Sequence, residues 1–168
     1  MNVIHINPFV QSVINVFNTM LDCPIQREGL ALKNGTFPTY DVTSVIGLSG
    51  LVRGSVVVSL SREVAFKIVE RMLGTEAVEI NLDVVDAVGE LANMVAGGAK
   101  AELSQYELSL GLPTVVVGKN HIIHFPDNVR PLQIPFRTPW GPMSLEVGLD
   151  AKSTIVDTPA CEETACAN

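Results

Sequence analysis

Apolar residues recur at helical spacing in three stretches of the chain. The first opens with Asn7 and Pro8, which suit the N-cap and the first helical position. The second is bounded by Ser61, a good N-cap, and by Gly74, a good C-cap. The third is the longest and runs from about 83 to 103. The pattern therefore predicts three α-helices, of which the first and the third are long.

Alternating apolar and polar residues, rich in Val and Ile, mark the strands. Residues 42–60 are interrupted only by a glycine-bounded turn at 50–54, so we expect a β-hairpin with one buried face. Beyond Pro113 the same pattern predicts four more strands, at 114–118, 121–125, 132–138 and 143–149. The turn Pro-Trp-Gly-Pro joins the last two strands and predicts a second hairpin.

The two halves of the chain share an order of elements, because each begins with a long helix and contains a hairpin. The runs VRGSVVVSLS and WGPMSLEVGLD are also alike, which predicts a divergent duplication, although two unrelated hairpins would produce the same likeness. Long amphipathic helices must bury their apolar stripes on a sheet. We therefore expect a two-layer α/β (α+β) domain over residues 1–150, with a pseudo-duplicated, mostly antiparallel sheet and two long helices packed on one face. Residues 151–168 have few large apolar groups and predict a flexible tail.

Composition excludes several classes of protein. The chain has 168 residues, of which 47% are hydrophobic and 17% charged, as in a domain with a packed core. Its net charge of −7 argues against binding to nucleic acid or to an anionic membrane. No apolar run is long enough for membrane insertion. The odd cysteine count, with Cys161 and Cys166 near the end and Cys23 far away, predicts no disulfide framework and a cytoplasmic location.

The long third helix carries the candidate chemistry. At 100° per residue, the side opposite its apolar residues collects Asp86, Glu90, Asn93, Gly97 and Lys100. Gly89, Gly97 and Gly98 lie inside the helix, where each costs about 0.8–1 kcal/mol relative to Ala, so close backbone approach is expected there. An acidic first turn, an ordinary polar face and glycines that serve helix–sheet packing account for this pattern. A docking face for another protein accounts for it as well.

Other motifs for catalysis or cofactors are absent from the sequence. His121 and His124 alternate on a predicted strand, so they point to opposite faces and cannot share a metal ion. There is no Ser/His/Asp arrangement, phosphate-binding glycine loop or dinucleotide motif. We therefore expect neither a metal nor a cofactor of its own.

One signature on the third helix resembles a known family. The run Asp86-x-x-x-Glu90-x-x-Asn93, followed by a glycine-containing apolar stretch and Leu-Pro-Thr at 112–114, is similar to the signature of the CheC/CheX/FliY family. Members of that family are phosphatases of the phosphorylated response regulator CheY in bacterial chemotaxis. The Asn-Pro-Phe opening at 7–9 belongs to the resemblance too. The first helix lacks the acid of a second site, so the chain resembles the single-site CheX branch.

The resemblance implies a function and a partner. The chain would dephosphorylate the aspartyl phosphate of a CheY-like receiver domain, which holds Mg²⁺ itself. Asn93 would orient the attacking water, and Glu90 would pair with the receiver's lysine. The neighbouring positions expected to contact the partner are Asp86, Gly89, Gly97 and Lys100. CheX-type relatives also imply a homodimer through sheet edges, for which segments 114–125 and 132–149 are apolar enough.

Two other functions remain open at this stage. A non-catalytic adaptor of the same fold would bind a receiver domain or a flagellar-motor component and use Glu90 for docking alone. A small-ligand binding domain would instead show an apolar pocket between sheet and helices, remote from Glu90. Loss of dephosphorylation in an Asn93 variant separates the phosphatase from the adaptor.

Overall fold

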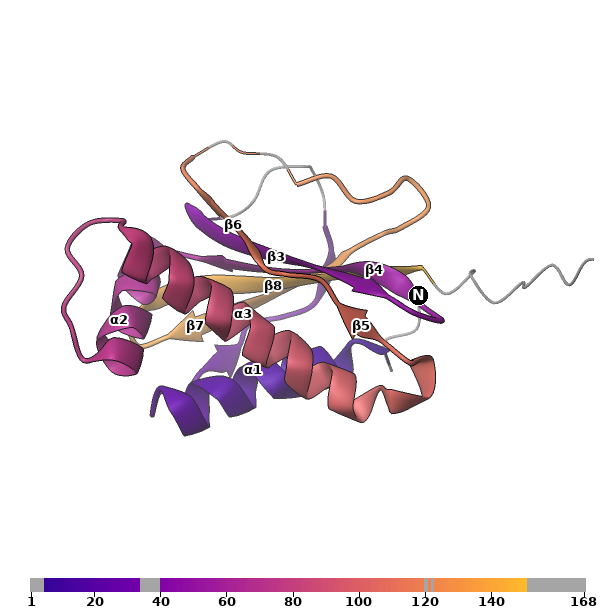
Figure 1. The fold of residues 1–168 in the computed structure, drawn as a ribbon, viewed down its shortest axis with the longest axis horizontal. Coiled ribbons are helices and arrows are strands. Elements are labelled where there is room, and N and C mark those ends of the chain that lie inside the picture. The colour runs from indigo at the N-terminus through magenta and orange to yellow at the C-terminus, as the bar shows by residue number, and fades with distance from the viewer. Residues whose placement is uncertain (1–4, 34–39, 120, 122, 151–168) are drawn as a thin grey trace, which may run out of the picture.

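A computed structural model describes residues 5–33, 40–119, 121 and 123–150 (Figure 1). In chain order the elements are α1 (Asn7–Met20), β1 (Gln26–Arg27), β2 (Ala31–Leu32), β3 (Val42–Ser49), β4 (Arg53–Leu60), α2 (Arg62–Leu73), α3 (Leu82–Glu102), a 3₁₀ turn (Ser104–Tyr106), β5 (Ser109–Leu110), β6 (Thr114–Val117), β7 (Leu132–Thr138) and β8 (Gly141–Asp150). The predicted tail at 151–168, with Cys161 and Cys166, lies outside the described residues.

All strands of the described residues join one sheet, and every pairing is antiparallel. The order is β1-β7-β8-β4-β3-β5, with β2 also on β7 and β6 also on β3. The two predicted hairpins therefore meet at the centre, where β4 pairs with β8. The short strands that follow α1 lie beside the second hairpin, and those that follow α3 lie beside the first. Each half of the chain thus places its short strands beside the hairpin of the other half, and this two-fold arrangement confirms the pseudo-duplicated sheet.

The helices cover one face of this sheet (Figure 1). Apolar residues of α1 and α3 share one hydrophobic core with alternate residues of the central strands, namely Val56, Val58, Leu60, Met143, Leu145 and Val147. Strand alternation directs these residues to the same side. The predicted two-layer fold with two long helices on one face is confirmed. Among the described residues, no helix has both the length and the apolar character needed to cross a membrane.

Local capping sets the ends of α2 and α3. The Ser61 hydroxyl accepts a hydrogen bond from the Val64 amide at 3.4 Å, and Gly74 ends α2 in the left-handed region with φ 73°. At the start of α3 the Asn81 side-chain oxygen accepts from the Val84 amide at 3.1 Å. These are the hydrogen bonds that N-terminal amides and C-terminal carbonyls of a helix lack.

The start of α1 differs from the prediction. Asn7 was expected to be the N-cap, but it is the first helical residue, and Ile6 takes the cap position without a side-chain hydrogen bond. Ile6 is only 1% exposed, and its carbonyl accepts from the Phe9 and Val10 amides. Burial of an apolar side chain has outweighed the capping preference here. Pro8 was expected at the first helical position and is the second helical residue, still within the first turn.

The predicted strand at 121–125 is wrong for the residues described there. His121 and residues 123–125 belong to no strand, and His121 Nδ1 is hydrogen-bonded to the Gly118 carbonyl at 2.8 Å. Phe125 instead covers the sheet face opposite the helices, where a Cβ atom at Gly148 would lie 2.6 Å from its ring. Phe125 thus packs onto the sheet and does not belong to a ladder.

The same face of the sheet buries an ion pair. Lys33 Nζ lies 2.6 Å from Glu146 Oε2 on β8, and the two side chains are 4% and 0% exposed. Burial raises the pKa of Glu146, and Lys33 opposes that rise. The ammonium group also lies 5.9 Å from the centre of the Phe125 ring. This pair ties the segment after β2 to a central strand.

One expectation about sheet edges needs correction. Segment 132–149 was expected to be apolar enough to pair with a second chain through a sheet edge. However, β8 lies between β7 and β4, and β7 is paired on its outer side with β1 and β2. Both strands of this hairpin already have neighbours in the chain. Of the two segments, only 114–125 reaches an edge, through β6, which pairs with β3 alone among the described strands.

Candidate functional site

The solvent side of α3 carries the predicted polar stripe. Asp86, Glu90, Asn93 and Lys100 are exposed and Gly97 is half-buried, and we call these five residues the α3 stripe. The apolar residues on the opposite side of the helix are all buried, namely Val84, Val88, Leu91, Val95 and Ala99. Glu90 and Asn93 therefore project together, one turn apart, from a helix whose other side is held in the core.

The three glycines of α3 have different surroundings. A Cβ atom at Gly98 would lie 2.3 Å from Ser12 Oγ, so α1 packs against the helix there. At the buried Gly89 it would lie 3.6 Å from the side chains of Pro113 and Val115, an ordinary contact. At Gly97 it would meet nothing within 4 Å. The predicted close approach is thus confirmed at Gly98 only. Gly97 lowers the helix propensity of α3, but among the described residues no neighbour packs closely enough to require a glycine there.

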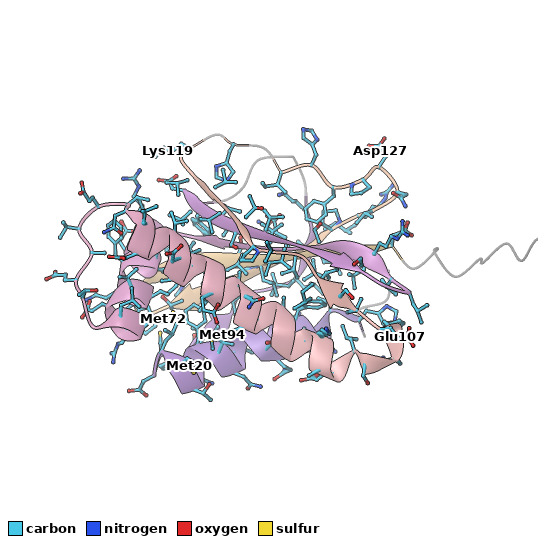
Figure 2. The ribbon with its side chains drawn as sticks, in the orientation of Figure 1. Met20, Met72, Met94, Glu107, Lys119 and Asp127 are labelled. Carbon is cyan, nitrogen blue, oxygen red and sulfur yellow. The ribbon has the colours of Figure 1, made fainter. Side chains whose placement is uncertain are left out.

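Gly97 lines a hollow on the surface of the protein. Its volume is about 420 Å³, and it is lined by Gly97, Lys100, Ala101, Ser104, Glu107 and Leu108. Figure 2 shows Glu107 at the end of α3, where the chain turns towards β5. Within the part of the chain that the structure describes, neither Lys100 nor Glu107 forms an ion pair. The α3 stripe therefore ends in an open depression with one free cation and one free carboxylate.

Apolar side chains border the α3 stripe. Leu112 is 91% exposed and precedes Pro113, which packs over Gly89 beside Glu90. On the other side, Met94 is half-buried against the core, as expected of a packing residue, and Figure 2 shows it between α3 and α1. An exposed apolar residue next to a polar pair is a common arrangement at protein interfaces.

The electrostatic character of the stripe changes along the helix. The acidic residues that lead into it are exposed and form no ion pair with any described residue; they are Glu76, Glu79, Asp83, Asp86 and Glu90. Lys100 is its single cation. The negative potential of the first three turns therefore favours a partner surface that offers positive charge.

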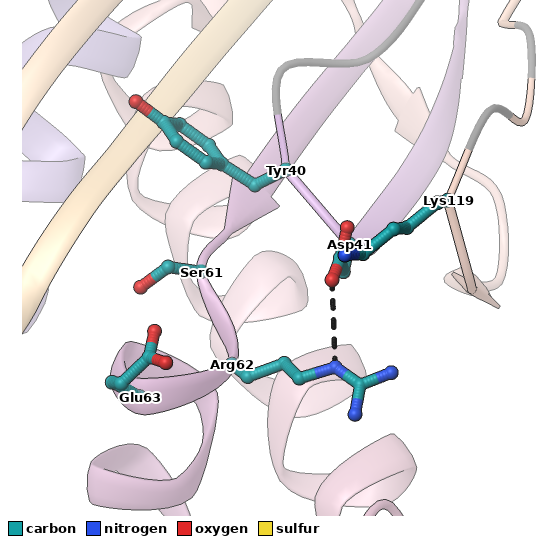
Figure 3. A pocket seen from close by; sticks show the side chains of 6 residues that line it. All are labelled: Tyr40, Asp41, Ser61, Arg62, Glu63 and Lys119. Atoms are coloured by element: carbon teal, nitrogen blue, oxygen red, sulfur yellow. Dashed lines mark ion pairs between the residues drawn. The ribbon is translucent and has the colours of Figure 1, made fainter.

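A larger hollow lies at the other end of the sheet and is charge-balanced. It has a volume of about 440 Å³, and its lining includes Tyr40, Asp41, Arg62 and Lys119 (Figure 3). Arg62 Nε lies 3.4 Å from Asp41 Oδ2, whereas the Glu63 carboxylate points towards Ser61. Two acids and two bases line this hollow, so no net charge selects a ligand. Among the described residues, no group of three or more His, Cys, Asp or Glu is placed to hold a metal ion.

We compared the chain with known protein families and solved structures. The family model for the chemotaxis phosphatase CheX matches residues 42–137, which include the α3 stripe. The solved structure of a CheC-like superfamily protein from Shewanella sp. PV-4 is 36% identical and superposes with a TM-score of 0.83, covering 89% of this chain and 99% of that one. The fold is thus that of the CheC-like proteins. The chain belongs to the CheX family.

Two further relatives bear on function. The CheY-P phosphatase CheX of Thermotoga maritima is 34% identical over 84 residues, which are 48% of this chain and 54% of that protein. The alignment thus spans about half the length of this curated relative. A chain of the CheX–CheY–BeF₃–Mg²⁺ complex from Borrelia burgdorferi is 21% identical with a TM-score of 0.71, covering 86% of this chain and 97% of that one. At that identity the likeness concerns the fold alone.

Proposed function

We propose that this protein is a phosphatase that hydrolyses the aspartyl phosphate of a CheY-like receiver domain in chemotaxis signalling. Membership of the CheX family and the relative named CheY-P phosphatase support the activity. The observation that carries the proposal is the pair Glu90 and Asn93, which projects from the rigid helix α3 into solvent. The complex of a CheX with CheY, BeF₃ and Mg²⁺ supports a receiver partner that brings its own Mg²⁺.

The proposed reaction requires little from this chain beyond positioning. Water attacks phosphorus in line with the aspartyl oxygen, the bond between phosphorus and that oxygen breaks, and inorganic phosphate leaves. The Asn93 carboxamide oxygen accepts a hydrogen bond from the water, and its NH₂ group donates to a phosphoryl oxygen. Fixing the water in this geometry lowers the barrier because the orientational entropy is lost before the chemical step.

Glu90 has a separate role in this proposal. Its carboxylate pairs with the lysine of the receiver's phosphate site, which fixes how deeply Asn93 enters. Asp86, Gly97 and Lys100 extend the contact along the α3 stripe, whereas the buried Gly89 lies behind it under Pro113. The chain contributes no metal or cofactor of its own, and it acts in the cytoplasm.

The activity is tested with receivers phosphorylated by a small-molecule phosphodonor. We expect the protein, at substoichiometric concentration, to shorten the lifetime of at least one phosphorylated CheY-like receiver and to release inorganic phosphate. Binding to the phosphorylated receiver without a change in its lifetime would contradict the proposal and favour the non-catalytic adaptor. Heat-denatured protein and an unphosphorylated receiver are the controls.

We also propose that the protein forms a homodimer through β6. This strand lies at the sheet edge, carries Val115, Val116 and Val117, and has one neighbour among the described strands. An exposed apolar edge of this kind favours pairing with a second chain. Light scattering after size-exclusion chromatography would show twice the monomer mass. Val117→Pro, which removes an amide that points away from β3, would return the monomer.

A further inference from the structure

A third hollow lies between α2 and the turn that joins β7 to β8. Its volume is about 380 Å³, and its apolar floor consists of Phe66, Ala77, Pro139 and Trp140. The centres of the Phe17 and Trp140 rings lie 6.5 Å apart, and the guanidinium carbon of Arg71 lies 5.9 Å from the centre of the Trp140 ring. The indole is half-buried and packed against the core, so it forms a fixed surface.

The rim of this hollow is acidic. Glu63, Lys67 and Glu70 line it from α2, and Glu76 lines it from the segment after that helix. Lys67 forms an ion pair with Glu70 and is thereby neutralised. Glu63 and Glu76 form no ion pair with any described residue. Two free carboxylates beside an apolar floor select a ligand that is both cationic and apolar.

The shape of the hollow favours an extended ligand. Its α2 residues follow one face of the helix from 63 to 70, seven steps that rise about 10 Å; they are Glu63, Phe66, Lys67 and Glu70. Glu76 lies beyond the end of α2. An extended peptide covers about 3.3–3.6 Å per residue, so three or four residues span the row along the helix.

We propose that this hollow, the Trp140 hollow, binds a basic peptide segment of a partner protein. One apolar or aromatic side chain of the segment packs on Trp140 and Phe66. Lys or Arg residues on either side of it pair with Glu63 and Glu76. The residues involved are distinct from the α3 stripe, so this inference does not rest on the phosphatase activity.

The chain contains a single tryptophan, which makes its fluorescence a reporter of this hollow. The test titrates the capped peptide Lys-Arg-Phe-Arg-Lys into the full-length protein with excitation of the indole alone. We expect a saturable change in emission that weakens as salt is added, because the charge pairs are screened. The peptides Lys-Arg-Gly-Arg-Lys and Glu-Asp-Phe-Asp-Glu should bind at least about tenfold more weakly, since each lacks one half of the recognition.

Charge-neutral variants complete the test. Glu63→Gln and Glu76→Gln should each weaken binding of the basic peptide by about threefold, as expected for loss of one exposed ion pair. Glu102→Gln, an exposed position on α3 outside the hollow, is the matched control and should bind as the wild type does. The proposal is overturned if emission does not change, if the glycine peptide binds equally well, or if Glu102→Gln weakens binding as much as the rim variants do.

Discussion

The side chain of Ser12 on α1 occupies the space that a Cβ atom at Gly98 on α3 would need. That Cβ would lie 2.3 Å from Ser12 Oγ and 3.2 Å from Ser12 Cβ, whereas at the adjacent Gly97 nothing lies within 4 Å. We expect Gly98→Ala to lower the free energy of unfolding by about 1–3 kcal/mol through overpacking. Gly97→Ala should raise it by up to about 1 kcal/mol through helix propensity. Urea unfolding of both variants checks this, and equal effects would contradict it.

Substitution of Asn93 by Ala should remove the stimulated hydrolysis while leaving the fold and docking intact. Asn93 is exposed, so the truncation creates no cavity. Loss of the group that orients water should lower the turnover rate by about 100-fold or more, in line with the loss of one positioned catalytic hydrogen bond. The measurement is the decay of phosphorylated receiver, with affinity determined separately. Asn18→Ala on the exposed face of α1 serves as control.

Substitution of Glu90 by Gln should act on the complex more than on the fold. Glu90 is exposed and forms no ion pair with a described residue, so its charge does not stabilise the chain through such a contact. Loss of one charge-assisted contact with the receiver should weaken binding by about 10- to 100-fold. Glu102→Gln on the same helix is the matched control. A marked drop in melting temperature in Glu90→Gln would show that Glu90 is structural.

Filling the depression at Gly97 separates docking from stability. Leu at this position enters the 420 Å³ hollow, meets no described atom near its Cβ, and improves helix propensity by about 0.8 kcal/mol or more. We therefore expect Gly97→Leu to be at least as stable as the wild type, yet to bind the phosphorylated receiver more weakly by about tenfold. Unchanged affinity in this variant would remove the hollow from the proposed docking surface without affecting the assignment of Asn93.

Separation of Lys33 from Glu146 should destabilise the fold. Glu146→Gln leaves a buried ammonium group without its carboxylate, which costs about 3–5 kcal/mol. Replacement of both residues, as Lys33→Met with Glu146→Leu, should restore most of that loss because no unpaired charge remains. Denaturant midpoints of Lys33→Met, of Glu146→Leu and of the double variant measure the coupling. Additive losses would show that the pair does not act as a unit.

Elements with strong local signals were predicted from the sequence. The caps Ser61 and Gly74 fix both ends of α2, and the helical period places the core side of α3. For the same reason the exposed pair Glu90 and Asn93 could be located before the structure was known. Their proposed chemistry rests on the family resemblance and not on helix geometry, which is why it stays a prediction.

Features that depend on distant partners could not be predicted. Lys33 and Glu146 are far apart in the chain, and the sequence around each of them does not predict that a charged side chain is buried there. The two-residue strands β1, β2 and β5 are too short for a period to be recognised. The strand predicted at 121–125 shows the converse error, because Phe125 is apolar for packing over Gly148 and not for a strand. The Trp140 hollow likewise forms only when α2 meets the β7–β8 turn.

The interleaved sheet has a consequence for synthesis on the ribosome. The first hairpin can form as soon as β4 has emerged. However, β4 cannot pair on its other side until β8, the last described strand, has been made, and β1 and β2 cannot pair until β7 has been made. Until translation has passed Asp150, the apolar residues of β4 that belong to the shared core have no neighbour on one side. The nascent chain therefore has to be kept from aggregating until β8 has been made, because β4, at the centre of the sheet, is translated long before its partner.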